Sequence, residues 1–167
     1  EIIEKLNNHG QTIILITHET YTAEYSQRII HLRDGVIEKD EKVLEAIGRV
    51  PRHLFMDSSF LQYAYKDQAF PIGAGQTISQ PFTVAVQTNL LQVERYDKIL
   101  EVGTGSGYQA AVLLEMGATV YTIERQRELF LKAQANLPKI GYNPKLFYGD
   151  GYKGLPTYGP FDKIIVT

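Results

Sequence analysis

The strongest constraint on the fold is a regular alternation of strand-like and helix-like segments in the second half of the chain. Short β-rich runs at 98–102, 119–124, 145–148 and 162–167 are separated by helical patterns, of which the clearest are 108–116 and 125–137. Strands that alternate with helices predict a parallel sheet covered by helices on both faces. We therefore predict an α/β domain of Rossmann-like type, incomplete, with strand order 3-2-1-4.

A glycine-rich turn follows the first of these strands. Gly103-Thr104-Gly105-Ser106-Gly107 lies between a strand and a helix, where glycines permit a tight turn and the close approach of a ligand. A dinucleotide site has the form G-x-G-x-x-G, but here the third glycine comes one position early and Tyr108 stands in its expected place. Glu101 in the strand would also be a poor neighbour for a pyrophosphate. The turn therefore favours a ligand with a cationic or amino group.

Acidic residues also end the next two strands. Glu124 ends the strand at 119–124, where it is placed to accept hydrogen bonds from ribose hydroxyls. Asp150, in Gly149-Asp150-Gly151, follows the strand at 145–148 and is placed to bind an adenine amino group. Each feature alone is commonly a turn or a helix cap. Three of them at successive strand ends predict one ligand site, since α/β sheets bind ligands at the carboxyl ends of their strands.

From about residue 41 to 167 the sequence resembles bacterial protein-L-isoaspartate O-methyltransferases. The resemblance rests on stretches at 50–55, 71–81, 100–111, 120–125, 149–151 and 160–167. Many methyltransferases share the glycine turn, whereas the run Gly75-Gln76-Thr77-Ile78-Ser79-Gln80-Pro81 is far more specific. This run lies in a segment, 67–82, that is rich in proline and glycine and that we predict to be a functional loop.

The resemblance implies transfer of a methyl group from S-adenosylmethionine to the α-carboxylate of L-isoaspartyl residues in damaged proteins. The cofactor-binding residues would then be Thr77, Ile78, Ser79, Glu101, Gly103, Gly105, Gly107, Glu124, Asp150 and Gly151. Ser79 matches the family's active-site serine. A carboxylate of pKa ~4 is already ionised at neutral pH and needs no general base, so we interpret Ser79 as a donor that orients the substrate. The structural alternative for Ser79 is an N-cap for a helix that begins near Pro81.

Composition narrows the remaining choices. The net charge of −2 gives no reason to expect nucleic acid or a membrane surface as a partner. The chain has no cysteine, which excludes disulfides, zinc–thiolate sites and thiol nucleophiles, and we predict no metal site. No signal peptide is evident, so we expect a cytoplasmic protein whose partners are its isoaspartyl-containing substrates.

The first 40 residues have a different resemblance. Thr17-His18-Glu19, preceded by a buried strand at 12–17 and followed by the run 28–35, resembles the C-terminal part of an ABC-transporter ATPase domain. Asp34-Gly35 in that run predicts a β-hairpin. The chain contains no GxxxxGK[ST] loop that could hold ATP phosphates. We therefore predict two units, 1–40 and 41–167, and hypothesise a chimera of two partial genes.

Three rival functions stay open at this point. A different small-molecule methyltransferase is disfavoured by the 76–81 loop, and a nucleotide-binding transporter subunit by the missing phosphate loop. The third is an inactive fragment, because the family continues through three more strands beyond Thr167. For the same reason we expect the strand at 162–167 to be an exposed apolar edge, unless a strand from residues 1–40 pairs with it.

Overall fold

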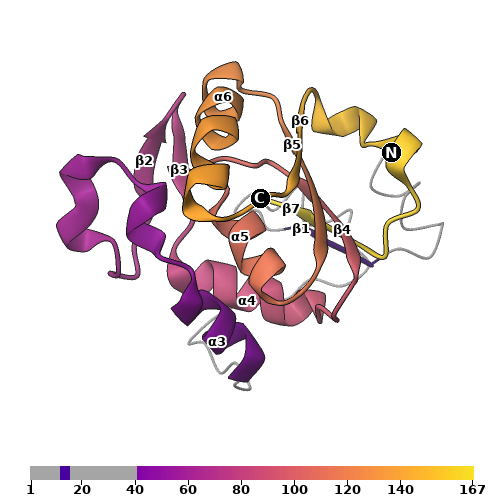
Figure 1. Cartoon of the computed structure of the whole chain (residues 1–167), viewed down its shortest axis with the longest axis horizontal. Coiled ribbons are helices and arrows are strands. Elements are labelled where there is room, and N and C mark those ends of the chain that lie inside the picture. The colour runs from indigo at the N-terminus through magenta and orange to yellow at the C-terminus, as the bar shows by residue number, and fades with distance from the viewer. Residues whose placement is uncertain (1–11, 16–40) are drawn as a thin grey trace.

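The computed structural model describes residues 12–15 and 41–167 and contains a five-stranded parallel sheet (Figure 1). Its strands, in spatial order, are β1 (Thr12–Leu15), β7 (Lys163–Val166), β4 (Lys98–Val102), β5 (Thr119–Glu124) and β6 (Lys145–Tyr148). Every pairing between neighbouring strands in this sheet is parallel. The predicted α/β fold is confirmed, and β6-β5-β4-β7 reproduces the predicted order 3-2-1-4.

The expectation of an exposed β7 edge is wrong. β1 pairs with β7 along its full length, from Thr12 opposite Lys163 to Leu15 opposite Val166. The backbone groups of β7 that would have faced solvent are thereby paired, and β1 takes the edge position in the described sheet. A strand from the segment with the transporter resemblance thus joins the main sheet. The rest of that segment, including the hairpin predicted at Asp34-Gly35, lies outside the described residues.

Four α-helices and five short 3₁₀ helices are described. The α-helices are α3 (Glu41–Arg49), α4 (Pro81–Leu91), α5 (Tyr108–Glu115) and α6 (Arg127–Asn136). The 3₁₀ helices are η1 (Arg52–Phe55), η2 (Ser58–Tyr63), η3 (Leu137–Ile140), η4 (Gly151–Lys153) and η5 (Pro156–Tyr158). The bounds of α5 and α6 lie within two residues of the ranges 108–116 and 125–137 that were predicted for them. The segment from residue 41 to 63 forms one α-helix and then two 3₁₀ helices.

The core forms on both faces of the sheet. On one face, Ile99 of β4, Val120 of β5 and Ile165 of β7 pack against α4 and α5. On the other, Leu100 and Tyr121 belong to an aromatic-rich cluster. Because side chains alternate along a strand, Glu101 and Thr122 lie on the helix-covered face, two residues beyond Ile99 and Val120. Both are fully buried.

A β-hairpin occupies the segment that we predicted to be an irregular loop, and this prediction is therefore wrong in part. β2 (Phe70–Gly73) and β3 (Gln76–Ile78) pair antiparallel, with an irregularity after Pro71. The hairpin stands beside α6, away from the five-stranded sheet (Figure 1). Lys132 of α6 donates to the carbonyl oxygen of Ile72 at 3.3 Å, which fixes the hairpin to that helix.

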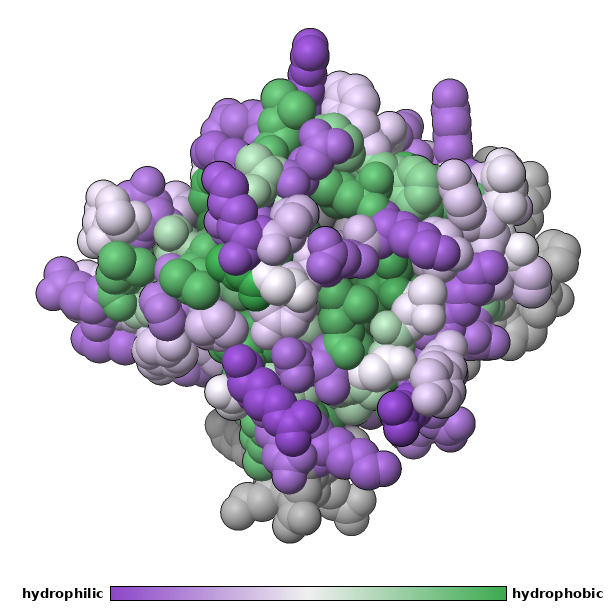
Figure 2. All heavy atoms as spheres, viewed as in Figure 1, coloured by the Kyte–Doolittle hydropathy of each residue, from purple (hydrophilic) through white to green (hydrophobic). Residues whose placement is uncertain are grey.

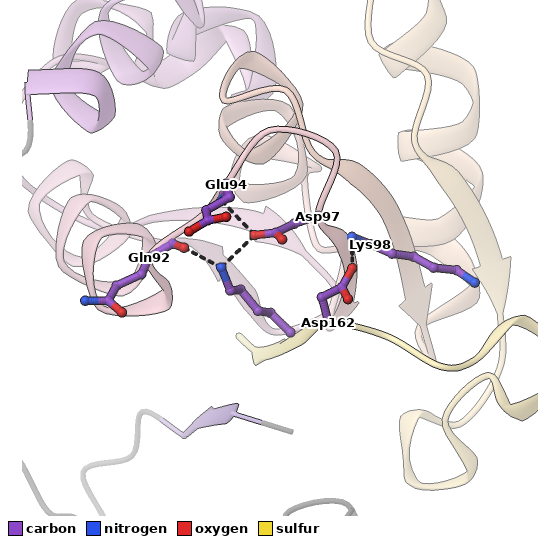
Figure 3. Close-up of polar contacts among 6 residues, drawn as sticks. Gln92, Glu94, Asp97, Lys98 and Asp162 are labelled. Atoms are coloured by element: carbon purple, nitrogen blue, oxygen red, sulfur yellow. Dashed lines mark hydrogen bonds and ion pairs between the residues drawn. The ribbon is translucent and has the colours of Figure 1, made fainter. Parts of the chain in front are cut away.

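The amino ends of β4 and β7 are joined by a compact polar network (Figure 3). Lys163 forms an ion pair with Asp97 at 2.6 Å and also donates to the carbonyl oxygen of Gln92. Asp97 accepts a second hydrogen bond, at 2.7 Å, from the backbone amide of Glu94. The Lys163 and Asp97 side chains are only 17% and 15% exposed. The network therefore holds the end of α4 and two central strands in register.

The visible surface is mostly hydrophilic, with apolar side chains exposed between the polar ones (Figure 2). The large exposed apolar residues are spread over several elements, among them Leu44 on α3, Leu61 on η2 and Leu131 on α6. In the part of the chain that the structure describes, no helix is long and apolar enough to cross a membrane.

Candidate active site

A cavity of about 280 Å³ opens at the carboxyl ends of β4, β5 and β7. Its walls are the glycine turn after β4, the end of β5, the start of η4 and the segment from β3 to α4. Nine of the ten residues proposed for the site line it: Thr77, Ile78, Ser79, Glu101, Gly103, Gly105, Glu124, Asp150 and Gly151. The topology therefore brings together four segments that are far apart in the sequence.

The glycine turn requires glycine at two cavity-lining positions. Gly103 has φ +101°, and a Cβ there would clash with the carbonyl oxygen of Thr167. Gly105 has φ +54°, and its backbone amide points to the Glu124 carboxylate. Side chains with a Cβ rarely adopt these angles, so the turn can approach a ligand only as a bare backbone.

Gly107 has a different environment and does not line the cavity. It has φ +85° at the start of α5, and a Cβ would lie 2.8 Å from the side chain of Leu137. This glycine lets α5 pack closely against η3. The structure therefore shows a packing reason for Gly107, separate from the cavity.

Glu101 is the most unusual group in the site. It is completely buried, and burial raises the pKa of its carboxyl to about 8. Its Oε2 accepts a hydrogen bond from Thr122 at 2.5 Å, which acts in the opposite direction and stabilises the ionised form. Its Oε1 has no hydrogen-bond partner. A buried carboxylate oxygen without a donor is costly, so this atom is available to a hydrogen-bond donor from a ligand.

Glu124 holds the glycine turn from the neighbouring strand. Its Oε2 accepts from the amide of Gly105 at 2.8 Å, and its Oε1 accepts from the amide of Gln126 at 2.7 Å. Each carboxylate oxygen has a second acceptor position. Glu124 can therefore keep both backbone contacts and still accept hydroxyl donors from the cavity side.

Asp150 and Gly151 form the wall at the end of β6. One oxygen of Asp150 accepts from the amide of Tyr152 at 3.0 Å and caps η4. Gly151 packs directly on Val102, and a Cβ there would clash with that side chain. The Asp150 carboxylate is exposed at the rim, where its other oxygen can receive a donor.

Ser79 lies between β3 and α4. It is partly buried and lines the cavity. The predicted N-cap role is wrong by one residue, because Gln80 is the N-cap of α4 and Pro81 takes the first helical position. Among the described residues that line the cavity there is no histidine or lysine, so neither of these bases accompanies Ser79 there.

Sequence reasoning missed several residues that shape this site. Thr104 and Thr122 form a buried hydroxyl pair at 2.6 Å, next to Glu101. Thr167 donates to the carbonyl oxygen of Gly103 at 2.6 Å. Thr122 could have been found from strand alternation, because it is directly opposite Glu101 in the parallel register. The Thr167 contact depends on tertiary structure and leaves no sequence signal.

Comparison with known proteins identifies the family. The model of the protein-L-isoaspartate(D-aspartate) O-methyltransferase family matches residues 23–167. A protein-L-isoaspartate O-methyltransferase from Christiangramia forsetii is 67% identical over 129 residues, which cover 77% of this chain and 61% of the relative. One from Flavobacterium psychrophilum is 65% identical over 134 residues, covering 80% and 62%. The chain thus spans about three fifths of the length of these relatives.

Solved structures share the fold. A structure described as protein-L-isoaspartate O-methyltransferase superposes with a TM-score of 0.68 at 24% identity, covering 99% of this chain and 46% of the other. A related Plasmodium falciparum structure, in complex with S-adenosyl-L-homocysteine, gives 0.62 at 20% identity, covering 99% and 71%. At these identities the likeness establishes the fold, while the family match and the bacterial relatives establish descent. The chain belongs to the protein-L-isoaspartate(D-aspartate) O-methyltransferase family.

Proposed function

We propose that this chain binds S-adenosylmethionine in the cavity and catalyses methyl transfer to the α-carboxylate of L-isoaspartyl residues in damaged proteins. The observation that carries the proposal is the meeting of two sequence motifs on one cavity. The glycine turn supplies one part of the lining, and residues 76–79 of the specific 76–81 segment supply another. Family membership supports the same reaction.

The residues present fit the cofactor. The unpaired Oε1 of Glu101 suits the cationic amine of the amino-acid part, because that amine offers both a charge and N–H donors. Glu124 has free acceptor positions for ribose hydroxyls, and Asp150 at the rim can accept from the adenine amino group. Gly103 and Gly105 leave the backbone bare where the cofactor would cross the turn.

The chemistry needs little from the protein beyond positioning. When bound, S-adenosylmethionine supplies an electrophilic methyl group. The substrate carboxylate is already an anion at neutral pH, so the reaction needs no general base from the cavity lining. Ser79 would donate its hydroxyl proton in a hydrogen bond that orients the carboxylate towards the methyl group. Thr77 and Ile78 of the same segment would cover the cofactor and exclude water.

Two measurements test the proposal. Isothermal calorimetry with S-adenosylhomocysteine should show one binding site per chain, and ATP should not bind. Methyl-ester formation should then be measured on an isoaspartyl peptide and on the same peptide with normal aspartate. We expect transfer to the isoaspartyl peptide alone. Absence of S-adenosylhomocysteine binding would refute the cofactor assignment, and equal transfer to both peptides would refute the substrate.

Replacement of Ser79 tests its role separately. In Ser79→Ala the orienting hydroxyl is lost, and we expect the rate of methyl transfer to fall at least about tenfold, as for loss of one hydrogen bond in the transition state. Ser58→Ala is the matched control, because Ser58 is an exposed serine of η2 that does not line the cavity. A rate for Ser79→Ala equal to that of the control would remove Ser79 from the reaction.

A separate proposal concerns the first 40 residues and the cell compartment. We propose that 1–40 derive from an ABC-transporter ATPase, a proposal supported by the Thr17-His18-Glu19 and 28–35 motifs. The family match begins at residue 23 and so overlaps this segment.

A cytoplasmic location is likewise proposed, supported by the absence of cysteine. In the calorimetric experiment, ATP binding would instead support a nucleotide-binding fragment, and binding of neither ligand an inactive one.

A further inference from the structure

A chain of two hydroxyls connects the glycine turn to the buried carboxylate. Thr104 of the turn contacts Thr122 of β5 at 2.6 Å between their Oγ1 atoms, and Thr122 contacts Oε2 of Glu101 at 2.5 Å. All three side chains are at most 3% exposed. Water therefore cannot replace these hydrogen bonds, and their direction is fixed by the protons that the three groups carry.

The protons can be assigned by counting. An ionised Glu101 can only accept, so Thr122 must give its single hydroxyl proton to Oε2. Thr122 then has only acceptor positions left, so the proton between the two threonines comes from Thr104. With Glu101 ionised, the chain runs from Thr104 through Thr122 to Glu101, and each bond polarises the next.

As a result, the two carboxylate oxygens of Glu101 differ in their hydrogen bonding. Oε2 is held by Thr122, while Oε1, in a residue that lines the cavity, has no partner. Without Thr122 the carboxylate would lose the one hydrogen-bond donor that the described residues give it, and no other hydrogen bond would hold its orientation. Thr122 itself does not line the cavity.

We propose that Thr122 is a positioning residue that holds Glu101 with its free oxygen towards the cavity and favours the anion needed to bind a ligand's cationic amine. This inference rests on the proposed cofactor site. Thr104 contacts Thr122 from the turn, so the hydroxyl chain connects the glycine turn to the Glu101 carboxyl group.

The groups around Glu101 determine the direction in which its pKa would move if the Thr122 hydroxyl were lost. Burial raises the pKa of Glu101, the nearby Glu124 carboxylate of β5 raises it further, and the Thr122 hydrogen bond lowers it. Its neighbour on β7, Ile165, is apolar. Asp150 and Arg125 are the other charged residues of the cavity lining. Loss of the Thr122 hydroxyl must therefore move the midpoint of Glu101 titration upward from about 8.

The test compares Thr122→Val with Thr88→Val. Thr88 is also completely buried and hydrogen-bonded to a cavity-lining side chain, Gln109, at 3.0 Å, but it does not contact Glu101. We expect Thr122→Val to weaken S-adenosylhomocysteine binding about tenfold, as for a hydrogen bond to a charged group, and Thr88→Val to change it less than about twofold. Thr122→Ser, which keeps the hydroxyl, should restore binding.

A ligand-free measurement separates positioning from packing. The Glu101 carboxyl can be titrated by ¹³C NMR in wild type, Thr122→Val and Thr88→Val, and only Thr122→Val should shift the midpoint upward. Equal losses of binding in both valine variants, or an unmoved midpoint in Thr122→Val, would overturn the inference while leaving the cofactor site intact. Wild type that fails to bind S-adenosylhomocysteine would overturn the proposed function, and this inference with it. If Thr122→Val does not fold, Thr104→Val tests the same chain and should shift the midpoint in the same direction by less.

Discussion

The two ends of strand β4 carry carboxylates in opposite situations. Asp97 precedes the strand and is matched by a cation, Lys163, and by a backbone amide (Figure 3). Glu101, near the other end, is more deeply buried and has one hydroxyl donor and one unpaired oxygen. The same type of group is thus satisfied at one end of the sheet and left partly unsatisfied at the other.

This difference between Asp97 and Glu101 indicates that one end of the sheet serves mainly stability and the other mainly ligand binding. The amino end of the sheet is closed by contacts within the chain, so the charge of Asp97 is already paired with Lys163 and contributes to folding. The carboxyl end keeps a desolvated carboxyl group, and the partner that its Oε1 lacks would come from a ligand. Such a group destabilises the free protein and is compensated when a cationic ligand binds, which is typical of functional sites.

Of the substitutions considered, removal of the Glu124 side chain should weaken ligand binding at the carboxyl end of the sheet the most. Glu124→Ala would leave ribose hydroxyls unpaired and would also release the amides of Gly105 and Gln126, so the turn would lose its support. We expect S-adenosylhomocysteine affinity to fall about 100-fold, or about 2.7 kcal/mol. Calorimetry measures this directly. Unchanged affinity would show that the ribose does not lie at Glu124.

Neutralisation of Glu101 should weaken binding and stabilise the free protein. Glu101→Gln keeps the shape but removes the charge that faces the cationic amine, so affinity should fall about 30-fold, or about 2 kcal/mol. The raised pKa means that Glu101 in the folded protein keeps its proton above the ordinary glutamate pKa of 4.5, where the unfolded chain has lost it. The stabilising effect of that proton is complete below pH 4.5 and is lost as the pH rises to about 8.

Denaturant unfolding at several pH values tests the predicted effect of Glu101→Gln on the stability of the ligand-free protein. Wild type should lose stability between pH 4.5 and 8 relative to Glu101→Gln, which has no proton to lose at this position. Parallel stability profiles for the two proteins would show that Glu101 is not the group responsible.

Disruption of the amino-end network should have a smaller and purely structural effect. Lys163→Met removes the cation that pairs with Asp97 while keeping the aliphatic stem, and we expect a loss of about 1.5 kcal/mol in the free energy of unfolding. S-adenosylhomocysteine affinity, measured where the variant is folded, should stay within about twofold. A large loss of affinity would mean that the two ends of β4 are not independent.

Much of the fold could be predicted from the sequence because its elements have clear periodicity and boundaries. β4 and β5 coincide with their predicted ranges, and α4 begins at Pro81, whose fixed φ suits the first turn of a helix. The hairpin of β2 and β3 was missed because both strands are very short and Pro71 and Gly73 look like loop residues. The sequence alone could not decide whether β1 pairs with β7 or leaves it as an exposed edge, because the pairing joins residues about 150 positions apart.

The sequence could predict most of the residues that line the candidate site, but it could not predict their contacts and hydrogen bonds. Residues at successive strand ends had to meet, because parallel strands present their carboxyl ends at one edge. That Gly107 would pack on Leu137, that Gln80 rather than Ser79 would cap α4, and that Glu101 would keep one oxygen unpaired are results of tertiary packing. No local pattern encodes them.

The most direct measurement is a ¹³C NMR titration of the Glu101 carboxyl without and with saturating S-adenosylhomocysteine. Without ligand we predict a midpoint near pH 8. With ligand, the cationic amine should keep Glu101 ionised well below that pH, and its midpoint should fall by at least about one unit, equivalent to a tenfold effect on binding. A midpoint that does not change when the ligand binds would contradict the assignment of Glu101 as the anion that receives the cofactor.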